Sequence, residues 1–127
     1  MNTLEKVVLE LKKLGLMPEQ DDNHVVFKYQ MVGYVYIQDP TDEQYFSLNI
    51  PFVMDVTEEN EYEVLKVMNE CNNLMKAVKL VNNDGQVWIS LEQRLQEDAE
   101  LEDMVKFGVI GLYAARDRFE NSMKGLC

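Results

Sequence analysis

Residues that could act in catalysis are few in this sequence and lie far apart. His24 is the only histidine, and it follows the carboxylates of Asp21 and Asp22. A histidine beside carboxylates can bind a metal ion, but one histidine where a loop meets a strand lacks the remaining ligands of a metal site. A Ser–His–Asp triad is not expected either, because no serine lies in a strained elbow motif and there is no second base.

The cysteines and the paired glycines also fail to indicate a reaction. Cys71 lies on the apolar side of a predicted helix, which favours a neutral thiol and a packing role over nucleophilic attack. Cys127 is the last residue of the sequence, so a disulfide between the two cysteines is not expected. Gly108 and Gly111 fall inside a predicted helix rather than between a strand and a helix, so they do not form a phosphate-binding loop.

Five acidic residues cluster around the predicted start of a helix near Asn60. They are Asp55, Glu58, Glu59, Glu61 and Glu63. The helix dipole favours carboxylates at this end, which accounts for the cluster structurally. General acid–base catalysis would require the carboxylates to converge in a pocket, which a sequence does not show. We therefore predict no catalytic, metal-binding or cofactor-binding residues, no cofactor, and a protein that is not an enzyme.

Composition and charge limit the class of protein and its partners. The chain has 127 residues, of which 46% are apolar and 28% are charged, as expected for one folded domain. Its net charge of −11 opposes polyanions, so we predict no nucleic-acid partner and no membrane partner. The sequence has no cleavable signal and no apolar run long enough to span a bilayer, which predicts a cytoplasmic protein.

Most of the negative charge lies between residues 19 and 63, where eleven acidic residues accompany one basic residue, Lys28. One interpretation is that acidic loops keep a small domain soluble. The other is that this surface favours a basic segment of a partner protein. The sequence leaves both interpretations open.

The first half of the chain is predicted to hold one helix and three strands. The helix begins after Asn2 or Thr3 and ends at Gly15, and its apolar residues recur at helical spacing. A polar loop is expected at residues 19–23. Strands are then expected at about 24–30, 34–38 and 45–54, with Gly33 marking a turn or bulge. Pro51 indicates an edge position or a bulge in the third strand.

The second half is predicted to hold a helix, a β-hairpin and a long closing helix. Asn60 and Glu63 can form a capping box at the start of the first of these helices. The period then changes from helical to alternating, and the turn at residues 82–85 joins two strands. After a polar connection at 93–98, the closing helix runs from about Ala99 to Met123.

The predicted order is α-β-β-β-α-β-β-α. It implies a single α+β domain over residues 1–127, with a five-stranded antiparallel sheet and helices mainly on one face. Alternation assigns one set of strand residues to the helix-covered face: Val35, Ile37, Phe46, Leu48, Ile50, Phe52, Val78, Leu80, Val87, Ile89 and Leu91.

The opposite face of the sheet is predicted to be polar with scattered aromatic residues. Its aromatic members are Tyr34, Tyr36, Tyr45 and Trp88. Aromatic residues with polar tips are enriched in interfaces, so these four are our candidate surface for a dimer or for another partner protein. The alternative is that tyrosines suit strands and lie half-exposed without any partner.

The glycines of the closing helix allow two interpretations. Gly108 and Gly111 each cost a helix up to about 1 kcal/mol relative to alanine. With Ala115 they form a smooth strip along the helix. The strip allows close packing either on the sheet or on another chain.

A series of short motifs resembles a known family. They are Phe27-x-Tyr29, Tyr45-Phe46 leading to Pro51, Asn69 to Asn73, Lys76-Ala77-Val78-Lys79, Asp84-Gly85, and Val87-Trp88-Ile89 with Glu92. Over residues 24–120 the sequence resembles the YbjN-like group, small bacterial proteins described as sensory transduction regulators with the fold of type III secretion chaperones. The resemblance implies a non-enzymatic protein that is often dimeric. Secretion chaperones are small, acidic homodimers that hold an extended segment of a partner.

Taken together, these features predict a non-catalytic, chaperone-like protein-binding or regulatory module that acts as a homodimer. Its partner would be a protein or peptide, bound along a sheet edge or across an apolar patch. A different class of function is a small-molecule-binding protein or enzyme, with a site built from carboxylates and Tyr29, Tyr34 or Tyr36. A third alternative is a structural subunit of a larger assembly.

Overall fold

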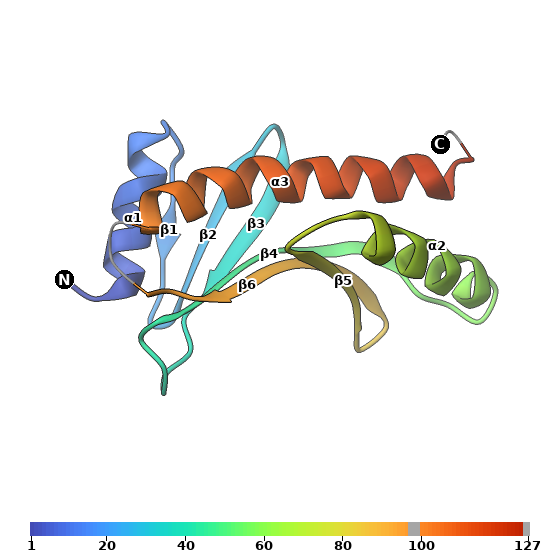
Figure 1. Cartoon of the computed structure of the whole chain (residues 1–127), viewed down its shortest axis with the longest axis horizontal. Coiled ribbons are helices and arrows are strands. Elements are labelled where there is room, and N and C mark those ends of the chain that lie inside the picture. Colours follow the sequence, from blue (N-terminus) through green and yellow to red (C-terminus); the bar gives the residue numbers. More distant parts are fainter. Residues whose placement is uncertain (97–99, 126–127) are drawn as a thin grey trace.

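The computed structural model describes residues 1–96 and 100–125. Its elements are α1 (Thr3–Lys13), β1 (Glu19–Gln20), β2 (His24–Tyr29), β3 (Val32–Ile37), β4 (Tyr45–Asp55), α2 (Glu61–Leu74), β5 (Val78–Asn83), β6 (Gln86–Arg94) and α3 (Glu100–Met123). The strands form an antiparallel sheet in the order β1-β2-β3-β4-β6-β5. The long helix α3 crosses one face of this sheet, with α1 towards β2 and α2 towards β5 (Figure 1).

The predicted α+β class and the helices on one face are confirmed, but the sheet has six strands rather than five. The additional strand is β1, which lies where a polar loop was predicted. Glu19 and Gln20 pair with Val26 and Val25, and the turn is closed by the Asp21 N–H, which donates to the His24 carbonyl at 2.8 Å. Both residues of β1 are exposed and polar, so no alternation of apolar and polar residues indicates this strand in the sequence.

The hairpin between β2 and β3 turns at Gln30 and Met31, not at Gly33. Both residues have positive φ, 51° and 70°, as in the type I′ turns that suit the twist of paired strands. Glycine and asparagine usually occupy such turns, so this one gave no sequence signal. Gly33 instead lies inside β3, paired with Lys28.

This register places Tyr34 and Tyr36 in the core, which corrects their predicted position on the opposite face. Tyr34 pairs with Phe27, and Tyr36 pairs with Val25. Directly paired residues point to the same side of a sheet, so the tyrosines follow their apolar neighbours inward. They are 1% and 0% exposed. The predicted inward residues Val35 and Ile37 therefore face the other way.

Pro51 marks a bulge in β4, as one of the two predicted alternatives stated. Ile50 pairs with Ile89 and Met54 pairs with Val87, so three residues of β4 lie opposite one residue of β6. Within the bulge, Phe52 has a φ of 54° and is 68% exposed. Its predicted place on the covered face is therefore wrong, because the bulge interrupts the alternation of the strand.

The helix ends follow their predicted signals in one case and not in another. Asn2 caps α1 by accepting from the Glu5 N–H at 2.9 Å, and Gly15 follows its C-terminus with a φ of 82°. The capping box predicted at Asn60 is not formed. The Asn60 side chain instead accepts from the Thr57 N–H at 2.7 Å and donates to the Asp55 carbonyl at 2.9 Å, which shapes the loop before α2.

Close packing of α3 on the sheet explains one of its two glycines. A Cβ added to Gly108 would lie 2.8 Å from Cδ2 of Leu48 and 3.1 Å from Cδ2 of Leu91. The predicted contact between helix and sheet is therefore confirmed at Gly108. Cys71 is 1% exposed in the same core, as predicted, whereas Cys127 and the predicted helix start at Ala99 lie outside the described residues.

Candidate binding surface on the open face of the sheet

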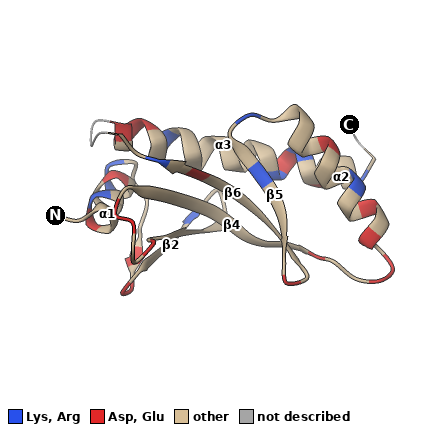
Figure 2. Ribbon diagram, turned by 60° about the horizontal axis from the view of Figure 1, so that its bottom comes forward, with Lys and Arg blue, Asp and Glu red and all other residues tan. Residues whose placement is uncertain are grey.

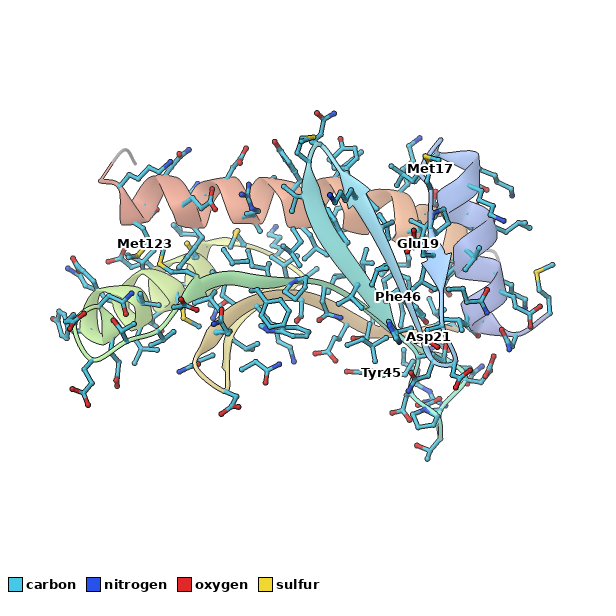
Figure 3. All side chains as sticks on the ribbon, turned by 180° about the vertical axis from the view of Figure 1, so that it is seen from behind. Met17, Glu19, Asp21, Tyr45, Phe46 and Met123 are labelled. Carbon is cyan, nitrogen blue, oxygen red and sulfur yellow. The ribbon has the colours of Figure 1, made fainter. Side chains whose placement is uncertain are left out.

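The face of the sheet that points away from the helices carries little charge at its centre. β4, the central strand of this face, has a single charged residue, Asp55, at its end. Acidic residues gather instead on helices and on the loops that surround the sheet (Figure 2). Seen from the side opposite to Figure 1, the strands lie in front of α3, with Met17 near one border of the face and Tyr45 near another (Figure 3).

One half of this face is an apolar hollow of about 750 Å³. Its lining residues include Met17, Val26, Val35, Phe52 and Trp88. Phe52 and Trp88 meet edge to face, with ring centroids 5.5 Å apart and planes at 71°. Met17 is 87% exposed and Phe52 is 68% exposed. Large side chains in a concave, uncovered patch are typical of a binding surface.

The backbone at Phe52 is held in a conformation that L-residues rarely adopt. The left-handed region costs a residue with a Cβ roughly 1–2 kcal/mol. Pro51 and the bulge turn Phe52 out of the core and towards Trp88. A strained residue that gains little burial from its position points to a role in binding rather than in stability.

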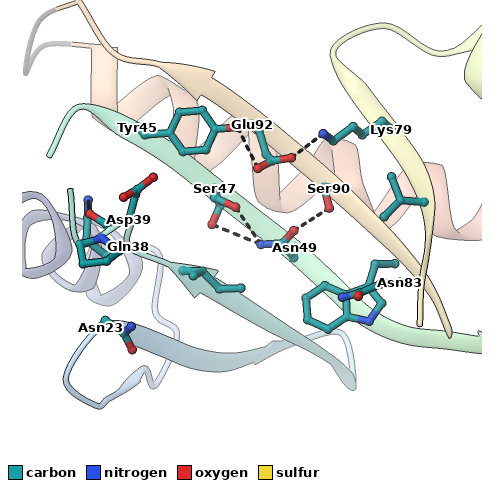
Figure 4. A pocket seen from close by; sticks show the side chains of 14 residues that line it. Asn23, Gln38, Asp39, Tyr45, Ser47, Asn49, Lys79, Asn83, Ser90 and Glu92 are labelled. Carbon is teal, nitrogen blue, oxygen red and sulfur yellow. Dashed lines mark hydrogen bonds and ion pairs between the residues drawn. The ribbon is translucent and has the colours of Figure 1, made fainter. Parts of the chain in front are cut away.

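The other half of the face is a polar hollow of about 470 Å³ (Figure 4). Its floor is a chain of hydrogen bonds across β4 and β6. Asn49 Nδ2 donates to Ser47 Oγ at 3.2 Å, and the Ser90 hydroxyl donates to Asn49 Oδ1 at 2.6 Å. All three residues are buried, and they lie on strands with a helix behind the sheet (Figure 4). Their mutual hydrogen bonds fix the floor of the hollow.

A second polar chain joins three strands beside this floor. The Tyr45 hydroxyl donates to Glu92 Oε2 at 2.9 Å, and Lys79 Nζ lies 2.6 Å from Glu92 Oε1. Burial raises the pKa of Glu92, but the hydrogen bonds from Lys79 and Tyr45 outweigh it and leave that pKa below its usual value. The pKa of Tyr45 is raised mainly by its hydrogen bond to Glu92 and secondly by burial. The three groups therefore satisfy one another as a carboxylate, an ammonium and a neutral phenol.

The two hollows adjoin at Trp88, which lines both of them, and we refer to them together as the trough. The trough offers apolar contact at one end and hydrogen-bonding groups at the other. Among residues 1–96 and 100–125 there is no group of three or more histidine, cysteine or carboxylate side chains placed to hold a metal ion. The arrangement is therefore suited to binding a chain with both apolar and polar side chains.

A side chain covers the middle of the outer edge of β5. The Leu80 N–H donates to Asn72 Oδ1 at 2.8 Å, and Asn72 Nδ2 donates to the Leu80 carbonyl at 3.1 Å. The amide of Asn72 thus occupies both backbone groups of Leu80, which an added strand would otherwise use. Covering an edge in this way protects a sheet against unwanted pairing, and it favours the trough over this edge as the place for a partner.

The structure brings two of the four predicted surface residues to the open face. Tyr45 and Trp88 line the trough, whereas Tyr34 and Tyr36 are buried. The Tyr34 hydroxyl donates to the Val109 carbonyl at 2.7 Å, and the Tyr36 hydroxyl donates to Gln38 Oε1 at 3.1 Å. Burial raises the pKa of both phenols well above their usual range. They cannot contribute to the tyrosine site considered as an alternative.

Sequence reasoning missed the apolar half of the trough. Val35 was assigned to the covered face because the phase of β3 was misread, and Phe52 was assigned there because the bulge was not taken into account; Val26 was not assigned to either face. The signal for Phe52 was Pro51, which indicated a bulge and therefore an interrupted alternation. Nothing in the local pattern placed Met17, which reaches the trough from the segment between α1 and β1.

Comparison with known proteins establishes the fold. No protein-family model matches the sequence, and no curated protein matches it. YbjN from E. coli, for which a role in transcription regulation has been suggested, superposes with a TM-score of 0.71 at 9% identity, covering 96% of this chain and 93% of YbjN. An uncharacterized protein from Methanothermobacter thermautotrophicus superposes with a TM-score of 0.66 at 14% identity, covering 95% of this chain and 96% of the archaeal protein.

These similarities confirm the expected YbjN-like fold over nearly the whole chain. Identities this low establish a shared architecture and carry no assignment of activity. Within the described residues, none of the helices has the length and apolar content required to cross a bilayer.

Proposed function

We propose that this protein is a non-catalytic, chaperone-like or regulatory module that holds an extended segment of a partner protein in the trough on its open sheet face. The observation that carries the proposal is the aromatic pair of exposed Phe52 and half-buried Trp88, in a hollow that no described helix covers. A fold of this kind, with one face of its sheet left open, leaves room for a chain.

An extended segment fits a trough that has one apolar half and one polar half. Side chains alternate along an extended chain, so one set can enter the trough while the other faces solvent. An apolar side chain would contact Phe52 and Trp88, while polar ones would meet Tyr45 and Glu92. The Ser47, Asn49 and Ser90 groups already satisfy one another, so a small polar ligand gains few new hydrogen bonds there.

Charge gives the segment its expected sign. The chain carries a net charge of −11, and three of its carboxylates, those of Glu19, Asp39 and Glu92, line the trough. Such a field attracts positively charged segments and accelerates their association. We therefore propose that the segment combines apolar and basic residues, in a protein that acts in the cytoplasm as a homodimer.

Selection from a displayed library of random peptides tests this proposal. The selected peptides should be rich in apolar and basic residues. Phe52→Ala should weaken binding of a selected peptide by about tenfold, equivalent to about 1.4 kcal/mol. Tyr62→Ala is the matched control, because Tyr62 is an exposed aromatic residue in the acidic surroundings of Glu58 and Glu61. That variant should bind as the wild type does.

Two results would overturn the proposal. One is that no peptide is enriched over an unrelated acidic protein of similar size. The other is that Tyr62→Ala and Phe52→Ala weaken binding equally, which would show that peptides adhere to acidic surface in general. A metabolite that raises the melting temperature while peptides do not would favour the small-molecule alternative.

A further inference from the structure

Helix α3 carries an exposed apolar ridge on the side that points away from the sheet. Phe107 is 53% exposed and Ile110 is 54% exposed, and they stand on adjacent turns of the same helical face. The inward side of α3 contacts the sheet through Gly108. The ridge is therefore a separate surface from the trough, on the opposite side of the sheet (Figures 1 and 3).

Gly111, beside this ridge, has no packing reason to be a glycine within the described chain. A Cβ at this position would meet only the Phe107 ring of its own helix, at 3.8 and 3.9 Å, which is ordinary contact. Glycine in a helix interior nevertheless costs about 1 kcal/mol relative to alanine. Gly108 is explained by the sheet, and Gly111 is not.

The exposed face of α3 is complementary to itself when two copies cross antiparallel between Ile110 and Gly111. In that arrangement the bulky Ile110 of each copy lies opposite the other copy's Gly111, and Phe107 lies opposite Ala114. One turn further out, Asp103 lies opposite Arg118. All of these residues except Gly111, which is half-buried, are exposed. Each large side chain thus meets a small one, and each acid meets a base.

A groove next to the ridge has room for the aromatic ring of a second copy. It measures about 350 Å³ and lies between α3 and the start of β5. Met75, Val78, Gly111 and Ala114 line it, and Phe107 stands at one side. A Phe107 ring approaching from an antiparallel copy would meet Ala114 and the backbone of Gly111, where the absent side chain allows close approach.

We propose that the ridge of α3 binds a second copy of this chain in an antiparallel, two-fold symmetric helix pair. In such an isologous interface, every contact is made twice, so the pairs Asp103–Arg118, Phe107–Ala114 and Ile110–Gly111 each occur two times. Self-association is thereby assigned to α3 instead of the sheet face, where the sequence pattern had placed a surface for a dimer or another partner. The trough of each copy stays open.

The strength of the pair follows from its size and charge. Residues 103–118 span roughly 22 Å of helix at about 1.5 Å per residue. A single helix pair of this length is smaller than a standard stable interface, which buries ~1,600 Å². Each copy also carries a charge of −11. The dimer should therefore be reversible and concentration-dependent. The two Asp103–Arg118 ion pairs counteract the repulsion between the two negatively charged copies.

Sedimentation velocity from micromolar to millimolar protein tests the proposal, with circular dichroism to confirm folding. The wild type should shift from monomer to dimer over this range. Asp103→Arg places like charges opposite each other twice, as does Arg118→Asp, so each variant should weaken the dimer at least about tenfold. The double variant Asp103→Arg/Arg118→Asp restores both pairs and should restore the dimer.

Gly111→Ala gives a readout that a merely structural role would not give. Alanine should stabilise the monomer while it weakens the dimer, because the new methyl group meets the partner's Ile110. A wild type that stays monomeric throughout, a dimer unaffected by Gly111→Ala, or a double variant as weak as the single variants would each overturn the proposal. None of these results depends on whether the trough binds peptides.

Discussion

Substitutions of Phe52 measure how much its backbone conformation on the open face lowers the free energy of unfolding. Phe52 has a φ of 54° and is 68% exposed. Phe52→Gly and Phe52→Ala remove the same aromatic ring and the same contact with Trp88. Their difference in stability therefore isolates the backbone, because only alanine keeps a Cβ in the left-handed region.

The magnitude follows from two opposing effects. A Cβ in this region costs roughly 1–2 kcal/mol, whereas glycine loses about 0.5–1 kcal/mol through the greater freedom of its unfolded chain. Phe52→Gly should then be more stable than Phe52→Ala by about 0.5–1 kcal/mol. Phe52→Gly should also be close to the wild type, since the lost edge-to-face contact contributes about 0.5–1.5 kcal/mol and the relieved strain offsets it.

Urea unfolding followed by circular dichroism measures both differences, because it does not depend on the fluorescence of Trp88. The expected order of unfolding free energy is Phe52→Gly above Phe52→Ala, with both variants impaired in peptide binding. A Phe52→Ala variant at least as stable as Phe52→Gly would refute the reasoning. It would show that the backbone at this bulge is not strained, and that the position of Phe52 needs no functional explanation.

Four further substitutions test separate parts of the structure by urea unfolding. Gly108→Ala should destabilise the fold by about 1 kcal/mol, because overpacking against Leu48 and Leu91 exceeds the gain in helix propensity. Gly111→Ala in dilute monomer should stabilise the fold by up to about 1 kcal/mol. Equal changes in the free energy of unfolding for the two variants would contradict this account of α3. Asn72→Ala should cost about 1–2 kcal/mol and increase light scattering, since it removes two hydrogen bonds and exposes the edge of β5; unchanged scattering would argue against edge protection. Glu92→Gln should flatten the dependence of stability on pH in acid. The folded pKa of Glu92 lies below its unfolded value of about 4.3. The carboxylate therefore stabilises the fold above that pH, and this stabilisation is lost as the pH falls through the folded pKa. A variant whose stability depends on pH as steeply as that of the wild type would contradict this assignment.

Local signals in the sequence predicted several elements well. Asn2 caps α1 as expected, and Gly15 ends it. The hairpin between β5 and β6 turns at Asp84 and Gly85, both with positive φ, because this pair is suited to a type I′ turn. Where the residue types are those that the local geometry favours, the sequence alone predicted the structure.

The candidate site was harder to predict because it depends on registers that the usual residues do not mark. Gln30 and Met31 form a turn that normally requires glycine or asparagine, so the phase of β3 was misread and Tyr34 was placed outside. A one-residue error in register moves every side chain of a strand to the other face. The bulge after Ile50 had the same effect on Phe52. Of the four aromatic residues predicted for the open face, Tyr45 and Trp88 were placed correctly. Tyr45 precedes the bulge in β4, and Trp88 lies on a strand with clear alternation.

Chemical-shift mapping by NMR, with a peptide selected as described above, tests the central proposal most directly. Binding in the trough should shift the amide signals of Val35, Asn49, Phe52, Trp88 and Ser90, while those of Tyr62 and Ile110 stay in place. Shifts confined to α2 or α3, or spread evenly over acidic surface, would contradict the proposal that the open face of the sheet holds the partner segment.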